Sequence, residues 1–247
     1  MKPSRRVKTV NVADILPVDW QSCFSPEHPR IGLGLDIATT TKDKSNPSSL
    51  SVCQQVALSY YMRLVLRWKT ADPAVTKAIL RTILTGLPHG LRARRLCIDA
   101  TSERFFAAQL RREFAGLVPV ELVVASETIE HMGESMTMKS YLGNLFTNTI
   151  EDGYLALPPC EWIKTDIRLV SRDRGSFVAA IAEDGGHGDV WDGGKLALHA
   201  LMSKSGRADA HGAPTGTLGV NRGAVRAGVR NPWAKKFQKR GGIIRPI

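Results

Sequence analysis

Short apolar runs separated by polar turns dominate the chain from residue 31 onward. Such runs, rich in β-branched and aromatic side chains and bounded by turn-forming residues, predict strands. The first ends in Asp36-Ile37-Ala38, and the next two follow it closely enough to pair with it as antiparallel neighbours. The predicted strands span residues 31–38, 50–58, 61–68, 96–100 and 118–125, with a further extended segment at 154–157.

Apolar positions at helical spacing predict helices between and after the later strands. Asp72-Pro73 is typical of an N-cap followed by proline at the first helical position, and Ser102 is expected to cap the second helix. The predicted helices span residues 73–86, 105–114, 138–150 and 187–201, while residues 162–170 fit a short helix or a strand. Three strands before the first helix indicate an α/β fold with a mixed central sheet of about five strands flanked by helices.

The chain divides into three segments by composition. Residues 1–30 contain four prolines and no lasting periodicity, and they are interpreted as a lead-in or linker. Residues 31–203 carry all the predicted elements and form the folded domain. Residues 204–247 are rich in glycine, arginine and alanine, which predicts a flexible basic tail.

Charge is unevenly distributed between these segments. The 247 residues carry a formal net charge of +11, with the 43% hydrophobic and 23% charged residues of an ordinary globular protein. Residues 204–247 hold ten Lys and Arg and one acid, a charge of +9, which leaves 11 − 9 = +2 for residues 1–203. A polyanionic partner is therefore expected to bind through the tail rather than through the folded domain.

Several classes of protein are excluded by the sequence. No apolar run approaches the roughly 18 to 20 residues of a membrane span, and no secretory leader is evident. Four cysteines, spread singly, favour reduced thiols in a cytoplasmic protein over disulfides or a zinc site. Gly32 and Gly34 lack the third glycine and the following helix of a dinucleotide-binding motif.

Three aspartates lie at the ends of predicted elements. Asp36 and Asp99 each follow a buried strand, at the edge of the sheet where α/β folds place their sites. Asp189 lies in the first turn of the last helix, where the helix dipole favours an anion, and Asp192 lies one turn further on. The plainer interpretation of Asp36 and Asp99 is a turn or N-cap residue, and Asp99 fits it because a helix follows.

Converging carboxylates need cations to remain ionised together, and oxygen ligands suit Mg²⁺ or Mn²⁺. Two such ions can activate a water molecule and stabilise the leaving oxygen in phosphodiester cleavage. This pattern predicts a two-metal site at Asp36, Asp99 and Asp189.

The order of these motifs resembles the RNase H-like (ribonuclease H/integrase-type) nuclease fold, and within it the nuclease domain of the large terminases that package DNA into tailed phages. The resemblance covers residues 31–203, and the spacing of the third motif is similar to the Mu-like branch. The segment before it, 138–158, is also similar to the helix–Gly–strand–Pro segment of that family. The matching motifs are Gly34-Leu35-Asp36-Ile37-Ala38, Cys97-Ile98-Asp99-Ala100-Thr101 and His187-Gly188-Asp189 with Leu196-Ala197-Leu198-His199-Ala200.

The resemblance implies a Mg²⁺- or Mn²⁺-dependent endonuclease that cuts double-stranded DNA during headful genome packaging. Asp36, Asp99 and Asp189 would be the catalytic metal ligands, with Asp192 or His187 as a further ligand. The implied partners are a terminase ATPase domain or subunit, the small terminase and the portal protein, with no membrane. The implied location is the host cytoplasm, transiently at the procapsid portal, and the isolated domain is expected to be monomeric.

Three features depart from the family pattern, and one is the segment 39–49, which is long and basic where many relatives are short. No G-x-x-x-x-G-K-[ST] motif is present, so ATP hydrolysis is not expected, and the chain is either an excised nuclease domain or one subunit of a split motor. Asp192-Gly193-Gly194-Lys195 stands where the family has small apolar residues, which leaves the full ligand set open.

Basic residues near the predicted site are candidates for DNA contacts. Lys139 matches a position where relatives often carry lysine, and a cation there suits a scissile phosphate. The tail stretch 233–237 interleaves aromatic and basic residues, as single-strand binders and docking segments both do. The candidates are Lys42, Lys44, Arg104, Lys139, Lys235 and Lys236.

Two other functions remain open at this stage. The chain fits another RNase H-like nuclease such as a junction resolvase, which would cut branched DNA faster than linear duplex. It also fits a degenerate, non-catalytic module that docks to DNA or to the portal through its tail.

Overall fold

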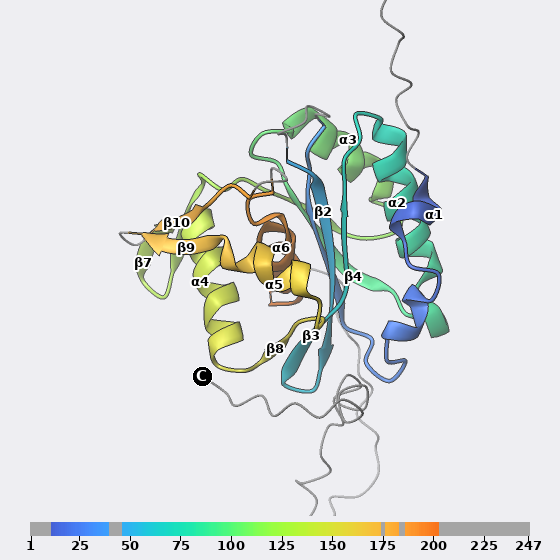
Figure 1. Cartoon of the computed structure of the whole chain (residues 1–247), viewed down its shortest axis with the longest axis horizontal. Coiled ribbons are helices and arrows are strands. Elements are labelled where there is room, and N and C mark those ends of the chain that lie inside the picture. The colour runs from blue at the N-terminus through green and yellow to red at the C-terminus, as the bar shows by residue number, and fades with distance from the viewer. Residues whose placement is uncertain (1–10, 40–45, 174–175, 183–185, 203–247) are drawn as a thin grey trace, which may run out of the picture. The chain divides into compact units, whose positions relative to one another are not determined.

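A six-stranded mixed sheet lies at the centre of the fold (Figure 1). The structure is a computed structural model that describes residues 11–39, 46–173, 176–182 and 186–202. The strands follow the order β5-β4-β1-β2-β3-β8, with parallel β1–β4, β4–β5 and β3–β8 pairs and antiparallel β1–β2 and β2–β3 pairs. Their bounds are β1 Ile31–Asp36, β2 Ser48–Val56, β3 Ser59–Trp68, β4 Ala93–Asp99, β5 Val120–Val123 and β8 Leu155–Ala156.

The five predicted strands are confirmed, and the extended segment before the two prolines adds the short strand β8. Outside the central sheet, two hairpins are formed by β6 (Thr128–His131) with β7 (Glu134–Thr137) and by β9 (Val170–Asp173) with β10 (Ser176–Ala179). The first hairpin follows β5 and leads directly into α4. Its tight turn is made by Met132 and Gly133, both at positive φ.

Helices cover both faces of the sheet (Figure 1). On one side lie α1 (Val12–Ile15), α2 (Pro73–Gly86) and α3 (Arg104–Phe114), and on the other α4 (Met138–Glu151), α5 (Glu161–Arg168) and α6 (Asp189–Met202). The 3-10 turns η1 (Trp20–Cys23) and η2 (Pro88–Gly90) complete the described elements. Among the described residues, no helix is long and apolar enough to cross a membrane.

The alternation of side chains along the strands gives the two faces of the sheet different characters. We call them the α2 face and the α6 face, after the helix that packs on each. Large apolar residues of β1, β2 and β4 point to the α2 face, whereas small or polar residues point to the α6 face. The first set is Ile31, Leu33, Leu35, Leu50, Val52, Leu96 and Ile98, and the second is Gly32, Gly34, Asp36, Ser49, Ser51, Arg95, Cys97 and Asp99.

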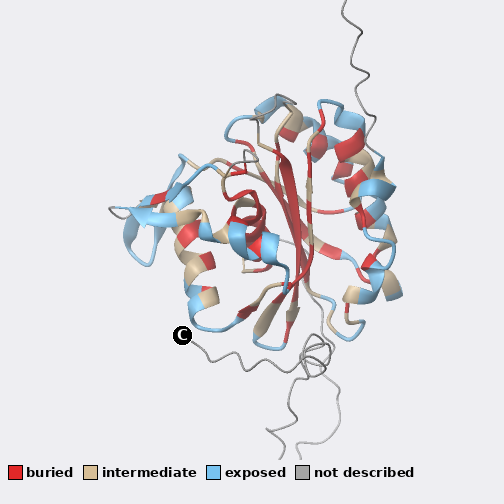
Figure 2. Ribbon diagram, in the orientation of Figure 1, coloured by how far each residue is buried: buried red, intermediate tan, exposed pale blue. Residues whose placement is uncertain are grey.

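Glycines on β1 let α6 lie directly against the sheet. A Cβ atom at Gly34 would lie 2.2 Å from the backbone N of Ala197 and 2.2 Å from the backbone O of Gly193. At Gly32 it would lie 2.6 Å from the backbone O of Ala197. The two glycines thus serve helix packing, and α6 is buried along almost its whole length (Figure 2).

Part of the expected lead-in packs with the core of the α2 face. We expected a linker over residues 1–30, yet Leu16, Trp20 and Phe24 are buried in the same apolar cluster as α2 and α3. Their large side chains lie far apart in the segment and produce no sequence periodicity, because each contacts the core from a short turn. The expected tail, residues 204–247, lies outside the described residues.

Two capping predictions have different outcomes. The Asp72 side chain accepts a 2.9 Å hydrogen bond from the backbone N of Ala74 and caps α2, as predicted. The prediction for Ser102 is wrong: the N-cap position of α3 is Glu103, which makes no side-chain capping bond. Glu103 instead accepts a 2.6 Å hydrogen bond from the Thr39 hydroxyl and ties α3 to the end of β1.

Candidate metal centre

Asp36 and Asp99 meet at one edge of the sheet because their strands are parallel neighbours. Leu35 of β1 pairs with Ile98 of β4, so the next residue on each strand is the aspartate. The alternation of side chains directs both carboxylates to the α6 face. The sequence prediction that these two residues lie together is therefore met by the strand register.

Asp192 on α6 is a close electrostatic neighbour of Asp36. Burial, and then the negative charges of Asp192, Asp99 and Asp189 in that order, raise the pKa of Asp36 well above its usual value, whereas Lys195 lowers it. Among the carboxylates, Asp192 has the largest effect and Asp189 the smallest. By their effect on the pKa of Asp36, Asp192 and Asp99 are its main charged neighbours, and Asp189 has a smaller effect.

Asp189 lies in a separate buried setting at the start of α6. Its carboxylate is fully buried, 4.0 Å from Nη1 of Arg67 and 3.8 Å from Nδ1 of His187. Neither oxygen has a hydrogen-bond partner among the described residues. Burial, and then the charge of Asp166, raise the pKa of Asp189 to about 6, against the opposing effects of His187 and Arg67.

Asp166 of α5 caps α6 from a different helix. Its Oδ2 accepts a 2.7 Å hydrogen bond from the backbone N of Val190, and its Oδ1 lies 3.8 Å from Nη1 of Arg67. Burial raises the pKa of Asp166, and the backbone hydrogen bonds of α6 oppose that rise. Neither Asp166 nor Arg67 is signalled by the sequence, because a cap supplied by one helix to another leaves no local motif.

Lys195 brings a cation into the acidic group. Its Nζ donates to Oδ1 of Asp192, three residues earlier on the same helix, and only 6% of the residue is exposed. In the sequence, the only indication of this pair is that Asp192-Gly193-Gly194-Lys195 replaces the small apolar residues of the family pattern. Gly193 has a different role, in the packing of α6 on the sheet. A Cβ atom at this position would lie 3.0 Å from the Ser49 hydroxyl of β2.

Asp99 stabilises the turn after β4 and also offers an oxygen to the candidate site. One oxygen, Oδ1, accepts a 2.7 Å hydrogen bond from the backbone N of Thr101, which is the turn role expected of an aspartate here. The Thr101 hydroxyl in turn accepts from the backbone N of Ala125. This arrangement fixes the carboxylate at the strand end and leaves its second oxygen for a ligand.

These carboxylates suit a hard divalent cation. The group of Asp36, Asp99 and Asp192 carries three negative charges and one positive charge from Lys195 when all are ionised. The raised pKa of Asp36 reflects burial first and then repulsion from Asp192 and Asp99, which Lys195 opposes. Oxygen donors with excess negative charge are the ligands that Mg²⁺ and Mn²⁺ prefer.

Some of the other predicted site residues lie near Asp192, and others do not. His187 and Lys139 line a 330 Å³ cavity together with Asp192 and Lys195. Arg104 is exposed at the first turn of α3. Lys42, Lys44, Lys235 and Lys236 lie outside the described residues. A larger cavity of 810 Å³, lined by α4 and the β6–β7 hairpin, contains none of the site aspartates.

A second group of potential ligands lies deeper on the α6 face. The ligand atoms of Cys97, Glu121 and His199 all lie within 4.8 Å of one another. Glu121 is already paired with Arg95 and with Nε2 of His199 at 3.0 Å. Burial raises the pKa of the Cys97 thiol well above its usual value, and the charge of Glu121 adds to it. We interpret this group as a link between α6 and the outer strands, because Glu121 of β5 contacts both Arg95 of β4 and His199 of α6.

Several solved structures of terminase nucleases are similar in fold to the chain. The chain is similar to the human cytomegalovirus terminase nuclease domain, at 14% identity and a TM-score of 0.50 over 77% of this chain and 92% of that one. It is similar to the large terminase of a thermophilic bacteriophage, at 10% identity and a TM-score of 0.52 over 73% of this chain and 41% of that one. The third similar structure is the large terminase nuclease of thermophilic phage G20c with bound magnesium, at 17% identity and a TM-score of 0.50 over 71% of this chain and 82% of that one.

These similarities confirm the predicted fold, an α/β domain of the RNase H-like, terminase-nuclease type. The chain covers less than half of the second of these proteins, the bacteriophage large terminase. No protein-family model and no curated protein matches the sequence. The assignment to the Mu-like branch stays a prediction.

Proposed function

We propose that the protein is a divalent-metal-dependent endonuclease that cuts double-stranded DNA during the packaging of a viral genome. The observation that supports the proposal is the strand register that brings Asp36 and Asp99 to one edge of the sheet, in a fold shared with terminase nucleases, with the charge of Asp192 acting on Asp36. Catalysis in such a centre needs carboxylates that are held rigidly and remain ionised when a cation is present. Strand register holds the first two, and the buried helix α6 holds the third.

The proposed ligands of two Mg²⁺ or Mn²⁺ ions are Asp36, Asp99 and Asp192. When bound, the ions would supply an activated water and charge stabilisation at the scissile phosphate. Asp192 takes the place that the sequence motif suggested for Asp189, because its charge acts more strongly on Asp36. Asp189, between Arg67 and His187, would position the first turn of α6 and add negative charge behind the centre.

Basic residues around the centre would bind the DNA backbone. Lys139 and His187 line the cavity beside Asp192, so they are placed to contact a phosphate bound there. Arg104 and the predicted contacts Lys42, Lys44, Lys235 and Lys236 would extend this interaction. The proposed partners remain a packaging ATPase, a small terminase and a portal protein in the host cytoplasm, with the nuclease itself monomeric.

The test is cleavage of supercoiled plasmid in Mn²⁺ and in Mg²⁺. Asp36→Asn, Asp99→Asn and Asp192→Asn are each expected to slow nicking by about 10²–10³-fold, because each removes charge that stabilises the transition state through the cation. Asp152→Asn, at the exposed end of α4, is the matched control and should cut as the wild type does. Full activity in Asp36→Asn would contradict the proposal.

Two further outcomes separate the alternatives. Faster cutting of a four-way junction than of linear duplex would favour a resolvase. Absence of any calorimetric response to millimolar Mn²⁺ would make the aspartates structural and leave a non-catalytic module.

A further inference from the structure

Lys195 is a buried cation inside an otherwise acidic centre. Its ammonium contacts Oδ1 of Asp192, and the two residues are three positions apart on α6. Burying an ammonium costs free energy unless it is paired, so its place beside a carboxylate is energetically required. The apolar side chains of Phe177 and Trp191 line the same cavity and leave few other polar partners on that side.

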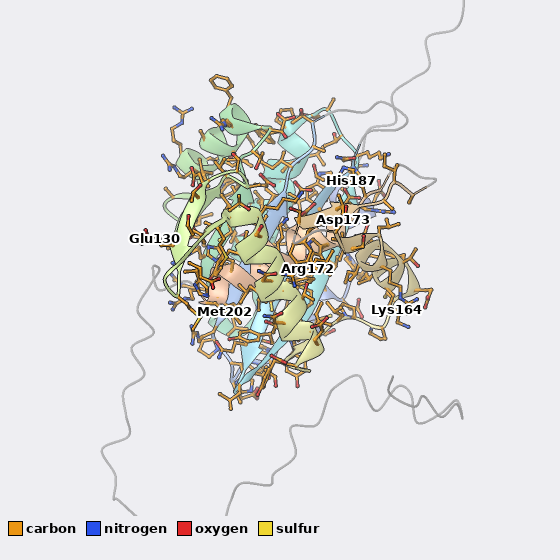
Figure 3. The ribbon with its side chains drawn as sticks, turned by 90° about the vertical axis from the view of Figure 1, so that its left-hand side faces the viewer. Glu130, Lys164, Arg172, Asp173, His187 and Met202 are labelled. Carbon is orange, nitrogen blue, oxygen red and sulfur yellow. The ribbon has the colours of Figure 1, made fainter. Side chains whose placement is uncertain are left out.

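The pair contrasts with a lysine of identical spacing on a neighbouring helix. Lys164 pairs with Glu161 on α5 at 3.3 Å, also three residues apart, but both side chains are largely exposed. Figure 3 shows Lys164 at the outer edge of the molecule, well separated from His187 beside the centre. Surface pairs of this kind contribute little, whereas the Asp192–Lys195 pair joins a buried ammonium to a half-buried carboxylate beside the proposed metal ligands.

The Lys195 ammonium and a divalent cation require the same carboxylate. Asp192 offers two oxygens, and one is already bound to Lys195. A cation held by Asp36 and Asp99 alone would not need this carboxylate, whereas a cation that also used Asp192 would have to share it with the ammonium. The effective dielectric constant of such sites is about 20. At that value, repulsion between the Lys195 ammonium and a divalent cation at Asp192 would make this cation bind more weakly than one at Asp36 and Asp99.

We propose that Lys195 is the resident counter-ion of the acidic centre and makes its two metal positions unequal. The position at Asp36 and Asp99 fills first, and the position at Asp192 fills only against the Lys195 ammonium. This inference rests on the proposed function, since it concerns the same centre. It goes further by assigning Lys195 as a positioning residue that sets the metal concentration at which the second ion binds.

Calorimetric titration of the full chain with Mn²⁺ tests the inference without a cleavage assay. The wild type should show one tighter and one weaker site. Lys195→Met should tighten the weaker site by about tenfold or more, because it removes the competing charge. Lys195→Arg keeps the charge and should bind as the wild type does, and Lys164→Met is the matched surface control with no expected change.

A second measurement tests the inference even if the variants are less stable than the wild type. In thermal melts, Lys195→Met should be less stable than the wild type without metal and should gain more from Mn²⁺, since the cation replaces the missing charge. Lys195→Gln should behave in the same way. Unchanged or weaker Mn²⁺ binding in Lys195→Met, or equal tightening in Lys195→Arg, would overturn the inference.

Failure of the proposed function gives a different result. In that case Asp36→Asn and Asp192→Asn would leave Mn²⁺ binding unaltered, whatever Lys195→Met does. If both aspartate variants lose Mn²⁺ binding while Lys195→Met binds as the wild type does, the metal centre is supported and the role of Lys195 is contradicted.

Discussion

The two faces of the central sheet are built on opposite principles. On the α2 face, the strands present leucine, isoleucine and valine to α1, α2 and α3, and the contact is a conventional apolar core. On the α6 face, the same strands present glycine, serine, cysteine and aspartate, and α6 replaces the missing side chains with its backbone. The α2 face buries apolar area, whereas the α6 face brings the backbone of a helix directly against β1.

This difference separates stability from chemistry within one sheet. Burial of apolar side chains is worth roughly 25 cal/mol per Å², and the α2 face can gain this without constraint from a site. The α6 face buries Asp189, Lys195 and His199 and has raised carboxyl pKa values, so it carries a free-energy cost. We infer that the apolar face offsets the free-energy cost of burying these charged groups.

The most severe test of the contrast adds one methyl group to the α6 face. Gly34→Ala would place Cβ 2.2 Å from two backbone atoms of α6, and no rotamer change can relieve a backbone contact. We expect a loss of about 3 kcal/mol or more in the free energy of unfolding, together with loss of Mn²⁺ binding, because α6 must move. Urea denaturation and calorimetric titration measure the two effects.

The neighbouring residue provides the control on the α2 face. Leu33→Ala removes a fully buried side chain and should cost about 3 kcal/mol, yet leave the strand ends and Mn²⁺ affinity as they are. Equal metal binding in Gly34→Ala and the wild type would show that the close approach of α6 does not position the centre.

The next test uses pH, because most of the free-energy cost of the α6 face comes from burying charged groups. The pKa of Asp189 is about 6 in the folded protein against an ordinary value of 3.8, so the folded state binds this proton more tightly. Stability should therefore fall as pH rises from about 4 to about 6, by about 2–3 kcal/mol from this group. Asp36 acts in the same direction, since its pKa is also raised.

Denaturation from pH 4.5 to 8 measures this slope, with Asp189→Asn as the comparison. The variant should show a shallower profile and greater stability at pH 8, because it removes a buried charge and keeps the side-chain shape. Saturating Mg²⁺ should also flatten the wild-type profile, since the cation favours the ionised carboxylates. An unchanged slope in Asp189→Asn would assign the pH dependence to Asp36 alone.

The sequence predicted the α2 face and the strand ends better than it predicted the contacts of α6. Alternating and helical periodicities located the five main strands, and Asp36 and Asp99 followed from their positions at strand ends. Asp192 was only a secondary candidate, because helical spacing alone does not say which turn of α6 faces the sheet. Asp166, Arg67 and Lys195 act across elements or in a buried pair, and only the packed structure brings those together.

The smallest expected effect compares how the two faces secure the helix that covers them. On the α2 face, Asp72 is exposed and caps α2 locally, so Asp72→Ala should cost about 1 kcal/mol and leave the centre unaffected. On the α6 face, Asp166 caps α6 from α5 and also raises the pKa of Asp189 through its charge. Asp166→Ala should cost about 1–2 kcal/mol through the lost cap, offset in part by the removal of that repulsion.

The two variants are separated by the pKa of Asp189 rather than by stability. Asp166→Ala should lower that pKa below 6, whereas Asp72→Ala should leave it in place, as followed by carboxyl carbon NMR shifts during titration. Charge is thus expected to couple the cap of α6 to the centre, while the cap of α2 stays independent of it. A shift of the Asp189 pKa in both variants, or in neither, would mean that the two faces of the sheet do not differ in this respect.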